Sequence, residues 1–316
     1  MSRSTVRFLL IALTCTLIAG ATVGASADDN KQVFAIYFGW WSNDGWRDER
    51  LSDAPAELYD VRDPATAATH IERAKAAGID GFIVAWLGIA NDNITHRSLL
   101  TLLEASETRD FQIGVMVDLN ERNFLETLGD LDQSLAFLVS DVITHPSYMR
   151  IDGQPAIYFW NQQRYTVGTW MNARAAYDPN YEQLWIMEGT TQSYMPTFDG
   201  MMLLDTAWAE NPADVNAYWQ ERTLMMGGRY FLPTVIPGWD ASAFAGWSPY
   251  ATPPVDRGDG ALLLQQWNAA AAVAESTLIV NSWNGYYYNT HIEPSLNFGS
   301  SAYDQLASLI PAWEQR

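Results

Sequence analysis

The chain has 316 residues, of which 48% are hydrophobic and 17% charged, a composition that supports a globular core and excludes a disordered protein. Aspartate and glutamate outnumber lysine and arginine by 37 to 18, so the formal net charge is -19. A surface this acidic repels phosphate groups, and we expect neither nucleic acid nor an anionic membrane as a partner. The length suits one large α/β barrel or two small domains.

Residues 1–27 have the pattern of a secretory signal peptide. Arg3 and Arg7 precede an apolar run over 8–19, and small residues follow up to Ala25-Ser26-Ala27. The run is too short to cross a bilayer. We therefore expect cleavage after Ala27 and a secreted or periplasmic protein that comprises residues 28–316. The single cysteine, Cys15, lies inside the signal, which excludes disulfides, thiol catalysis and cysteine-bound metals from the mature chain.

The mature sequence alternates short apolar runs with helical patterns. Asp63 before Pro64 predicts a helix start, and Gly78 predicts its end. Strands are predicted over 33–38, 79–86, 112–118, 155–160, 184–188, 198–205, 230–236 and 277–283, and helices over 64–77, 95–108, 124–144, 166–177, 212–226, 260–275 and 301–313. Eight strands, each followed by a helix or loop, predict an α/β fold with a single (β/α)8 TIM-type barrel over 28–316. A doubly wound open sheet is the alternative, but no glycine-rich phosphate loop follows the first strand.

Aromatic and polar side chains recur where the predicted strands end, which is where barrel enzymes carry their chemistry. The chain has 14 tryptophans. Flat aromatic faces stack on sugar rings, and interleaved polar groups bind hydroxyls, so the pattern predicts a glycan-binding cleft. The alternative is that the aromatic residues fill the core. The predicted substrate-binding residues are Tyr37, Trp40, Trp41, Trp86, Trp160, Trp208, Trp239, Asp240, Trp283, Asn284, Tyr286, Tyr288 and His291.

Carboxylates at the strand ends are candidates for glycoside hydrolysis, which uses one as acid and another as nucleophile or base. We predict Glu188 and Asp205 as the pair, with Asp118 as the alternative partner. Neighbouring strand ends place two carboxyl groups roughly 5–9 Å apart, as these mechanisms require. The four histidines have no metal-ligand spacing, so no metal or other cofactor is expected, although a site of aspartate and asparagine oxygens stays open.

Four segments together resemble the glycoside hydrolase family 99-like group, typified by endo-α-mannosidases and endo-α-mannanases. They are residues 35–40 (AIYFGW), 70–86 (HIERAKAAGIDGFIVAW), 148–158 (YMRIDGQPAIY) and 237–240 (PGWD). The resemblance implies a barrel with a glycan-binding cleft at its mouth.

The last loop departs from the family pattern. The family reads Ser-x-Asn-Glu-Trp-x-Glu-Gly-Thr-x-Ile-Glu-Pro, and its first two glutamates are the catalytic pair. Here Asn284 and Ile292-Glu293-Pro294 are kept, but Gly285 and Tyr288 stand at the glutamate positions. The resemblance therefore does not transfer the family mechanism. Three hypotheses follow: a hydrolase with relocated carboxylates, a non-catalytic glycan-binding protein on a decayed hydrolase barrel, and a tyrosine- or metal-assisted lyase or esterase.

Overall fold

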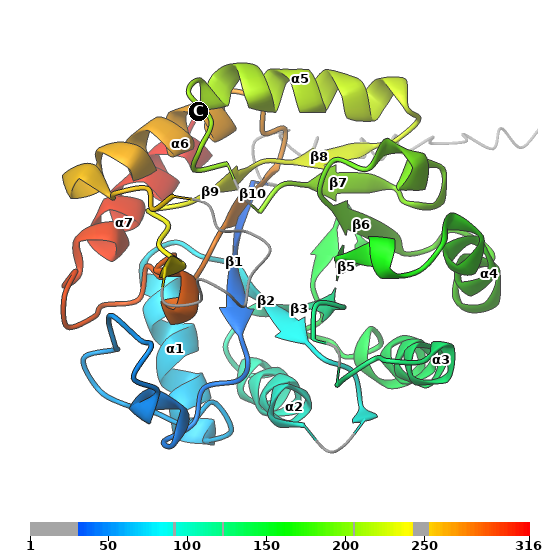
Figure 1. Cartoon of the computed structure of the whole chain (residues 1–316), viewed down its shortest axis with the longest axis horizontal. Coiled ribbons are helices and arrows are strands. Elements are labelled where there is room, and N and C mark those ends of the chain that lie inside the picture. The colour runs from blue at the N-terminus through cyan, green and yellow to red at the C-terminus, as the bar shows by residue number, and fades with distance from the viewer. Residues whose placement is uncertain (1–30, 91–92, 122, 205, 243–252) are drawn as a thin grey trace, which may run out of the picture.

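The structure, a computed structural model, describes residues 31–316 apart from 91–92, 122, 205 and 243–252. A sheet occupies the middle of the molecule, and helices surround it (Figure 1). Its strands are β1 (Gln32–Phe38), β2 (Gly81–Trp86), β3 (Gln112–Asp118), β4 (Arg150–Ile151), β5 (Gln154–Trp160), β6 (Leu184–Glu188), β7 (Gly200–Met202), β8 (Tyr230–Leu232), β9 (Thr234–Val235) and β10 (Thr277–Val280). All pair in parallel except β4, which pairs antiparallel with β5.

The sheet closes into a barrel through one broken strand. Its order is β8-β7-β6-β5-β3-β2-β1-β10-β9, and only Pro233 separates β8 from β9 in the chain. A proline has no N–H to donate to a ladder, so the strand is interrupted there. The carbonyl of Pro233 still accepts a hydrogen bond from the N–H of Ile279 of β10 at 3.0 Å. The run 230–235 therefore pairs with β7 at one end and with β10 at the other, and the predicted (β/α)8 barrel is confirmed.

Helices follow the strands as the sequence predicts. They are α1 (Pro64–Ala76), α2 (Ile94–Ser106), α3 (Leu128–Phe137), α4 (Val167–Tyr177), α5 (Pro212–Met225), α6 (Ala261–Ala271) and α7 (Ser301–Glu314). The Asp63 carboxylate caps α1 by accepting from Ala65 N, and Gly78, at a φ of +87°, follows its end. No helix in the described residues is both long enough and apolar enough to span a bilayer.

Two of the differences from the predicted elements have local causes. The helix expected over 124–144 begins only at Leu128, because Thr127 and Asp130 form a capping box, and it continues as a π-helical segment (Leu138–Val142). The hairpin of β4 and β5 was not predicted. Asp152 and Gly153 make its turn at φ values of +50° and +81°, a conformation that glycine and aspartate tolerate.

Alternate residues of each strand point to opposite sides of the barrel wall. Phe34, Ile36 and Phe38 belong to a buried cluster drawn from the strands and the segment around β4, with no helix residue, so this cluster fills the barrel interior. The intervening Val33, Ala35 and Tyr37 pack in a second cluster with helix residues such as Ile71 and Leu99. Both faces of each strand are therefore buried, as expected for a parallel sheet.

Candidate functional site

Three strand-end side chains lie level on one side of the barrel mouth. Asp118 ends β3 and pairs in register with Trp160 of β5, and the register of Phe159 with Met187 brings Glu188 of β6 level with Trp160. Each lies two positions after a residue of the interior cluster, namely Met116, Tyr158 or Ile186. Residues two positions apart share one face of a strand, so all three face the interior. Two strand spacings put the Cα atoms of Asp118 and Glu188 roughly 9–10 Å apart. We call Asp118, Trp160 and Glu188 the carboxylate side.

Asp118 is almost fully buried, and its surroundings favour the protonated acid. Its Oδ1 accepts from the N–H of Asn120 at 2.9 Å and from the Asn120 side-chain amide at 2.7 Å. Burial raises the pKa of the Asp118 carboxyl to about 6; the Asn120 hydrogen bonds oppose the rise, and the charge of Glu121 adds to it. An aspartic acid with such a pKa holds a proton to donate in mildly acidic solution.

Glu188 has a less buried position at the end of β6. Its carbonyl accepts from the amide of Gln162 at 2.9 Å, and the next N–H, of Gly189, donates to Met202 of β7. These contacts fix the backbone and leave the carboxylate on the interior side. Asp205, the other predicted carboxylate, lies outside the described residues.

The opposite side of the mouth carries a row of stacked rings, which we call the aromatic row: Trp40, Phe38, Tyr288, Trp239 and Trp208. Phe38 stacks on Trp40 at 4.5 Å between ring centroids, and Tyr288 stacks on Trp239 at 5.2 Å. Trp208 meets Trp239 edge to face at 5.0 Å. The rings thus cover one another's faces. The indole N–H groups of Trp40 and Trp239 have no partner in the described part of the chain.

The loop after β10 packs tightly behind the aromatic row. The Asn284 side chain accepts from Phe38 N at 2.7 Å and donates to Phe38 O at 3.1 Å, so it extends the barrel pairing to the end of β1. A Cβ at Gly285 would overlap the hydroxyl oxygens of Ser282 and Thr290 and lie 2.9 Å from a ring carbon of Phe38. No side chain fits at Gly285 as the loop is packed.

Glu293 ends this loop as a buried acceptor. Its Oε1 lies 3.1 Å from Nε2 of His70, and its Oε2 accepts from the hydroxyls of Tyr59 and Tyr286 at 2.9 and 3.1 Å. His70 continues the chain of contacts to the Tyr37 hydroxyl at 3.0 Å. Burial, then the charge of Glu293, raises the pKa of both Tyr59 and Tyr286 well above 10, so both hydroxyls keep their protons. This network ties the loop to α1 and gives both carboxylate oxygens of Glu293 partners within the protein.

His291 and Asp53 form a second buried pair behind the loop. Nε2 of His291 lies 3.0 Å from Asp53 Oδ2. Burial dominates at the histidine and lowers its pKa to about 4, although the bond to Asp53 acts in the other direction. At Asp53, burial raises the pKa, but hydrogen bonds from His291, Ser295 and Asn297 outweigh burial, so the pKa of Asp53 is lowered. The pair is therefore a neutral imidazole beside a carboxylate at neutral pH.

The family of this barrel follows from a comparison with known protein families. The model of glycosyl hydrolase family 71 matches residues 57–308. The chain belongs to glycosyl hydrolase family 71. No curated protein matches it in sequence.

Solved structures similar to this family 71 barrel include glycoside hydrolases. The GH99 endo-α-mannosidase from Bacteroides thetaiotaomicron has a TM-score of 0.75 at 18% identity, with 90% of this chain and 98% of that chain covered. A glycoside hydrolase-like protein has 0.69 at 15%, covering 90% and 95%. A GH113 β-mannanase from Alicyclobacillus acidocaldarius has 0.54 at 12%, covering 91% and 100%. The expected resemblance to the family 99-like group is thus confirmed for the fold.

The structure brings some predicted residues of the family 71 chain to the mouth. Trp160 lies between the two carboxylates, and Trp40, Trp208, Trp239 and Tyr288 form the aromatic row with Phe38. Asp240 is partly exposed at its edge, where its Oδ1 accepts from Ser242 N at 2.9 Å.

Seven predicted substrate-binding residues are buried within the fold instead of lying exposed at the mouth. They are Tyr37, Trp41, Trp86, Trp283, Asn284, Tyr286 and His291, each at most 1% exposed. Their side chains pack with the helix layer or within the β10 loop; Trp41, for example, donates to Asn284 O at 2.9 Å. Tyr37 and Trp86 face outward because they follow interior residues by one position.

Sequence reasoning missed Asn120 as the partner of Asp118 and Glu293 as the anchor of the β10 loop. The motif Ile292-Glu293-Pro294 was visible in the sequence, but nothing in it showed that its carboxylate turns into the core. Within the described residues, no group of three histidine, cysteine, aspartate or glutamate side chains converges as a metal site would require.

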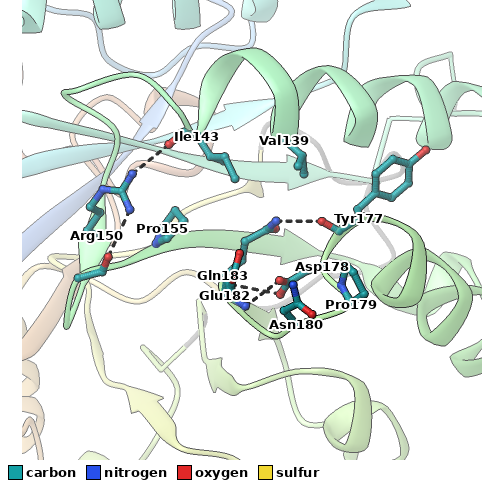
Figure 2. A pocket seen from close by; sticks show the side chains of 11 residues that line it. Val139, Ile143, Arg150, Pro155, Tyr177, Asp178, Pro179, Asn180, Glu182 and Gln183 are labelled. Atoms are coloured by element: carbon teal, nitrogen blue, oxygen red, sulfur yellow. Dashed lines mark hydrogen bonds between the residues drawn. The ribbon is translucent and has the colours of Figure 1, made fainter.

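A cavity of about 370 Å³ lies at the opposite end of the barrel, where β5 and β6 begin (Figure 2). Arg150, Tyr177, Asp178 and Gln183 are among its lining residues. Their polar groups bond within the protein: the Gln183 amide donates to Tyr177 O at 3.0 Å, and Asp178 accepts from the N–H groups of Glu182 and Gln183. The cavity is at the wrong end of the strands for barrel chemistry. We do not place the site there.

Proposed function

We propose that this family 71 protein is an exported glycoside hydrolase that cleaves a poly- or oligosaccharide with Asp118 and Glu188. The observation that carries the proposal is their level placement on the interior face, on either side of Trp160. Side chains that extend toward the barrel axis bring the carboxyl groups closer than their Cα atoms. The proposal requires the two carboxyl groups to lie within the roughly 5–9.5 Å that glycosidase mechanisms use.

The different environments of the two carboxyl groups support different roles in the proposed reaction. Burial raises the pKa of the Asp118 carboxyl to about 6, so Asp118 is the group that holds a proton for the leaving oxygen. Glu188 is more exposed and is the nucleophile or the base that activates water. Trp160 between them supplies an apolar ring against which a sugar ring stacks.

The test is a hydrolysis screen against α- and β-linked polysaccharides. Mannans come first, because the structural neighbours are named as an endo-α-mannosidase and a β-mannanase. Asp118→Asn and Glu188→Gln should each lower kcat by about 10²- to 10⁴-fold. Asp80→Asn is the matched control: Asp80 also has its pKa raised to about 6 by burial, but it precedes β2, at the other end of the barrel. Full turnover by either mouth variant would contradict the assignment.

A second candidate, a glycan-binding protein without activity, is favoured by one observation. Gly285, where the family 99-like pattern has a catalytic glutamate, has no room for a side chain. Calorimetric binding of one glycan with no hydrolysis by the wild type would support this candidate and reject the enzyme.

Export is a separate proposal, supported by the pattern of residues 1–27. N-terminal sequencing of the protein recovered from culture medium or periplasm should begin at Asp28. Recovery in the cytoplasm with Met1 or Ser2 at its start would reject it.

A further inference from the structure

Arg164 holds the loop that follows Asp118. It ends a short 3-10 helix (Gln162–Arg164) just beyond β5. A single guanidinium nitrogen, Nη1, donates to three carbonyl oxygens of the β3 loop: Leu119 at 3.1 Å, Glu121 at 3.1 Å and Phe124 at 3.2 Å. Two of the acceptors, Leu119 and Glu121, flank Asn120, so one side chain holds the backbone on both sides of Asn120.

Neighbouring contacts add to this fixation. Leu119 N donates to Trp160 O at 3.1 Å, and Asn161 donates to Leu119 O at 3.4 Å. The Tyr165 hydroxyl donates to Leu125 O at 2.7 Å. The segment after β5 thus holds the segment after β3 at several points, and Arg164 makes the most contacts.

The backbone contacts of Arg164 set the position of Asn120. The backbone N–H and the side-chain amide of Asn120 both donate to Asp118 Oδ1. The position of Asn120 follows from the carbonyls of Leu119 and Glu121 on either side of it. A buried carboxyl group is sensitive to the geometry of its donors, because few other groups solvate it.

We propose that Arg164 is a positioning residue, which sets the orientation and the proton affinity of Asp118 by holding the backbone on either side of Asn120. The inference rests on the proposed function only for its effect on turnover; the effect on the proton of Asp118 stands without it.

Several charged groups lie near Asp118, and the test must separate the effect of Arg164 on its pKa from the effects of the others. Glu121 lies on the same loop and favours the protonated acid, whereas Arg164 comes from the segment after β5 and favours the carboxylate. Glu188 lies level with Asp118 two strands away. Removal of Arg164 takes away a positive charge and loosens the donors of Asn120, and both changes favour the protonated form.

The experiment follows the Asp118 carboxyl carbon by NMR in protein labelled with ¹³C-aspartate, with the signal assigned by its loss in Asp118→Asn. In Arg164→Met the titration midpoint should move upward by about half a unit to one unit. Arg164→Lys keeps the charge but, with a shorter side chain, does not span the three carbonyls, so it should move the midpoint less. Arg150→Met is the matched control, because Arg150 also donates to two backbone carbonyls, of Gly153 and Ile143, at the other end of the barrel.

An unchanged midpoint in Arg164→Met, or an equal shift in Arg150→Met, would overturn the proposal. If Arg164→Met does not fold, Arg164→Lys decides, and an Asp118 titration identical to that of the wild type rejects the role. On an active substrate, Arg164→Met should lower kcat by about 10- to 100-fold with KM little changed, and should move the descending limb of the pH profile upward. If Asp118→Asn keeps its turnover, the proposed function fails while the titration still reports on Arg164.

Discussion

The carboxylate side and the β10 loop are both strand-end regions of one barrel, and they use their polar groups in opposite ways. On the carboxylate side, Asp118 and Glu188 face the interior at the mouth, and Asp118 has a single residue, Asn120, as its described hydrogen-bond donor. In the β10 loop, Asn284 and Glu293 turn into the fold, where each joins segments distant in sequence. The family 99-like pattern has its catalytic pair in the second region, where this chain has Gly285 and Tyr288, and the function proposed above uses the first region.

Two residues that match the family 99-like pattern have structural contacts in this barrel. Asn284 holds the loop to β1, and Glu293 holds it to α1. The two positions between them that face the mouth are occupied by a glycine without room and by a tyrosine in the aromatic row. Substitutions in the loop should therefore change stability, and substitutions on the carboxylate side should change activity.

The largest expected effect on stability is at Glu293. Glu293→Ala removes the acceptor of two tyrosine hydroxyls and His70 in a buried site, and should lower the free energy of unfolding by about 3–5 kcal/mol. Urea denaturation measures this, with Glu188→Gln as the control on the other region. A comparable loss in Glu188→Gln would remove the distinction between the two regions.

The next effect concerns Asp118 itself. Its pKa is raised in the folded protein, so the folded state is penalised for holding the charge, and stability falls as pH rises from about 4 to about 6. Asp118→Asn should therefore stabilise the protein at pH 7 by about 2–3 kcal/mol and should lose this advantage near pH 4. Urea midpoints at both pH values test it. An equal effect at the two values would mean that the charge is not the cause.

Crowding at Gly285 gives a smaller effect. Gly285→Ala should cost about 1–3 kcal/mol, because the new methyl group meets Ser282, Thr290 and Phe38. Gly168→Ala is the control: Gly168 is the second residue of α4, and its nearest neighbour would be 3.8 Å from the new Cβ. Thermal unfolding should show the control unchanged or slightly stabilised. Tolerance of Gly285→Ala would show that the loop can open.

The smallest effect is the acid response of His291. Its pKa is lowered in the folded protein, so the unfolded chain binds the proton more readily, and stability is lost as pH falls from about 6.5 toward 4. At pH 5.5 the loss should be about 1.4 kcal/mol. It should be absent in His291→Asn, which does not titrate. An unchanged acid response in that variant would assign the loss to other groups.

Prediction from sequence was strongest for the order of the elements. Local capping by Asp63, Pro64 and Gly78 sets the two ends of α1. The predicted bounds of β3 and β6 agree with the structure, because each strand is an apolar run that ends in one acidic residue. The strand predicted over 230–236 splits at Pro233, and the helix predicted from 124 starts at Leu128 because of a capping box that apolar spacing does not show. For the site, Trp160 and the aromatic row lie at the mouth, whereas Tyr37, Trp86 and Trp283 pack against helices.

The sequence by itself determined an acidic α/β barrel whose strands end in carboxylates and aromatic rings, because capping, turn residues and apolar runs act over a few neighbours. Only the tertiary structure decided which strand-end residues face the interior. In a parallel barrel both faces of a strand are apolar, so alternation separates two sets without saying which set points inward. The register between β3, β5 and β6 placed Asp118 level with Glu188, and the packing of Asn284 and Glu293 closed the β10 loop. Both outcomes depend on contacts between residues far apart in the chain.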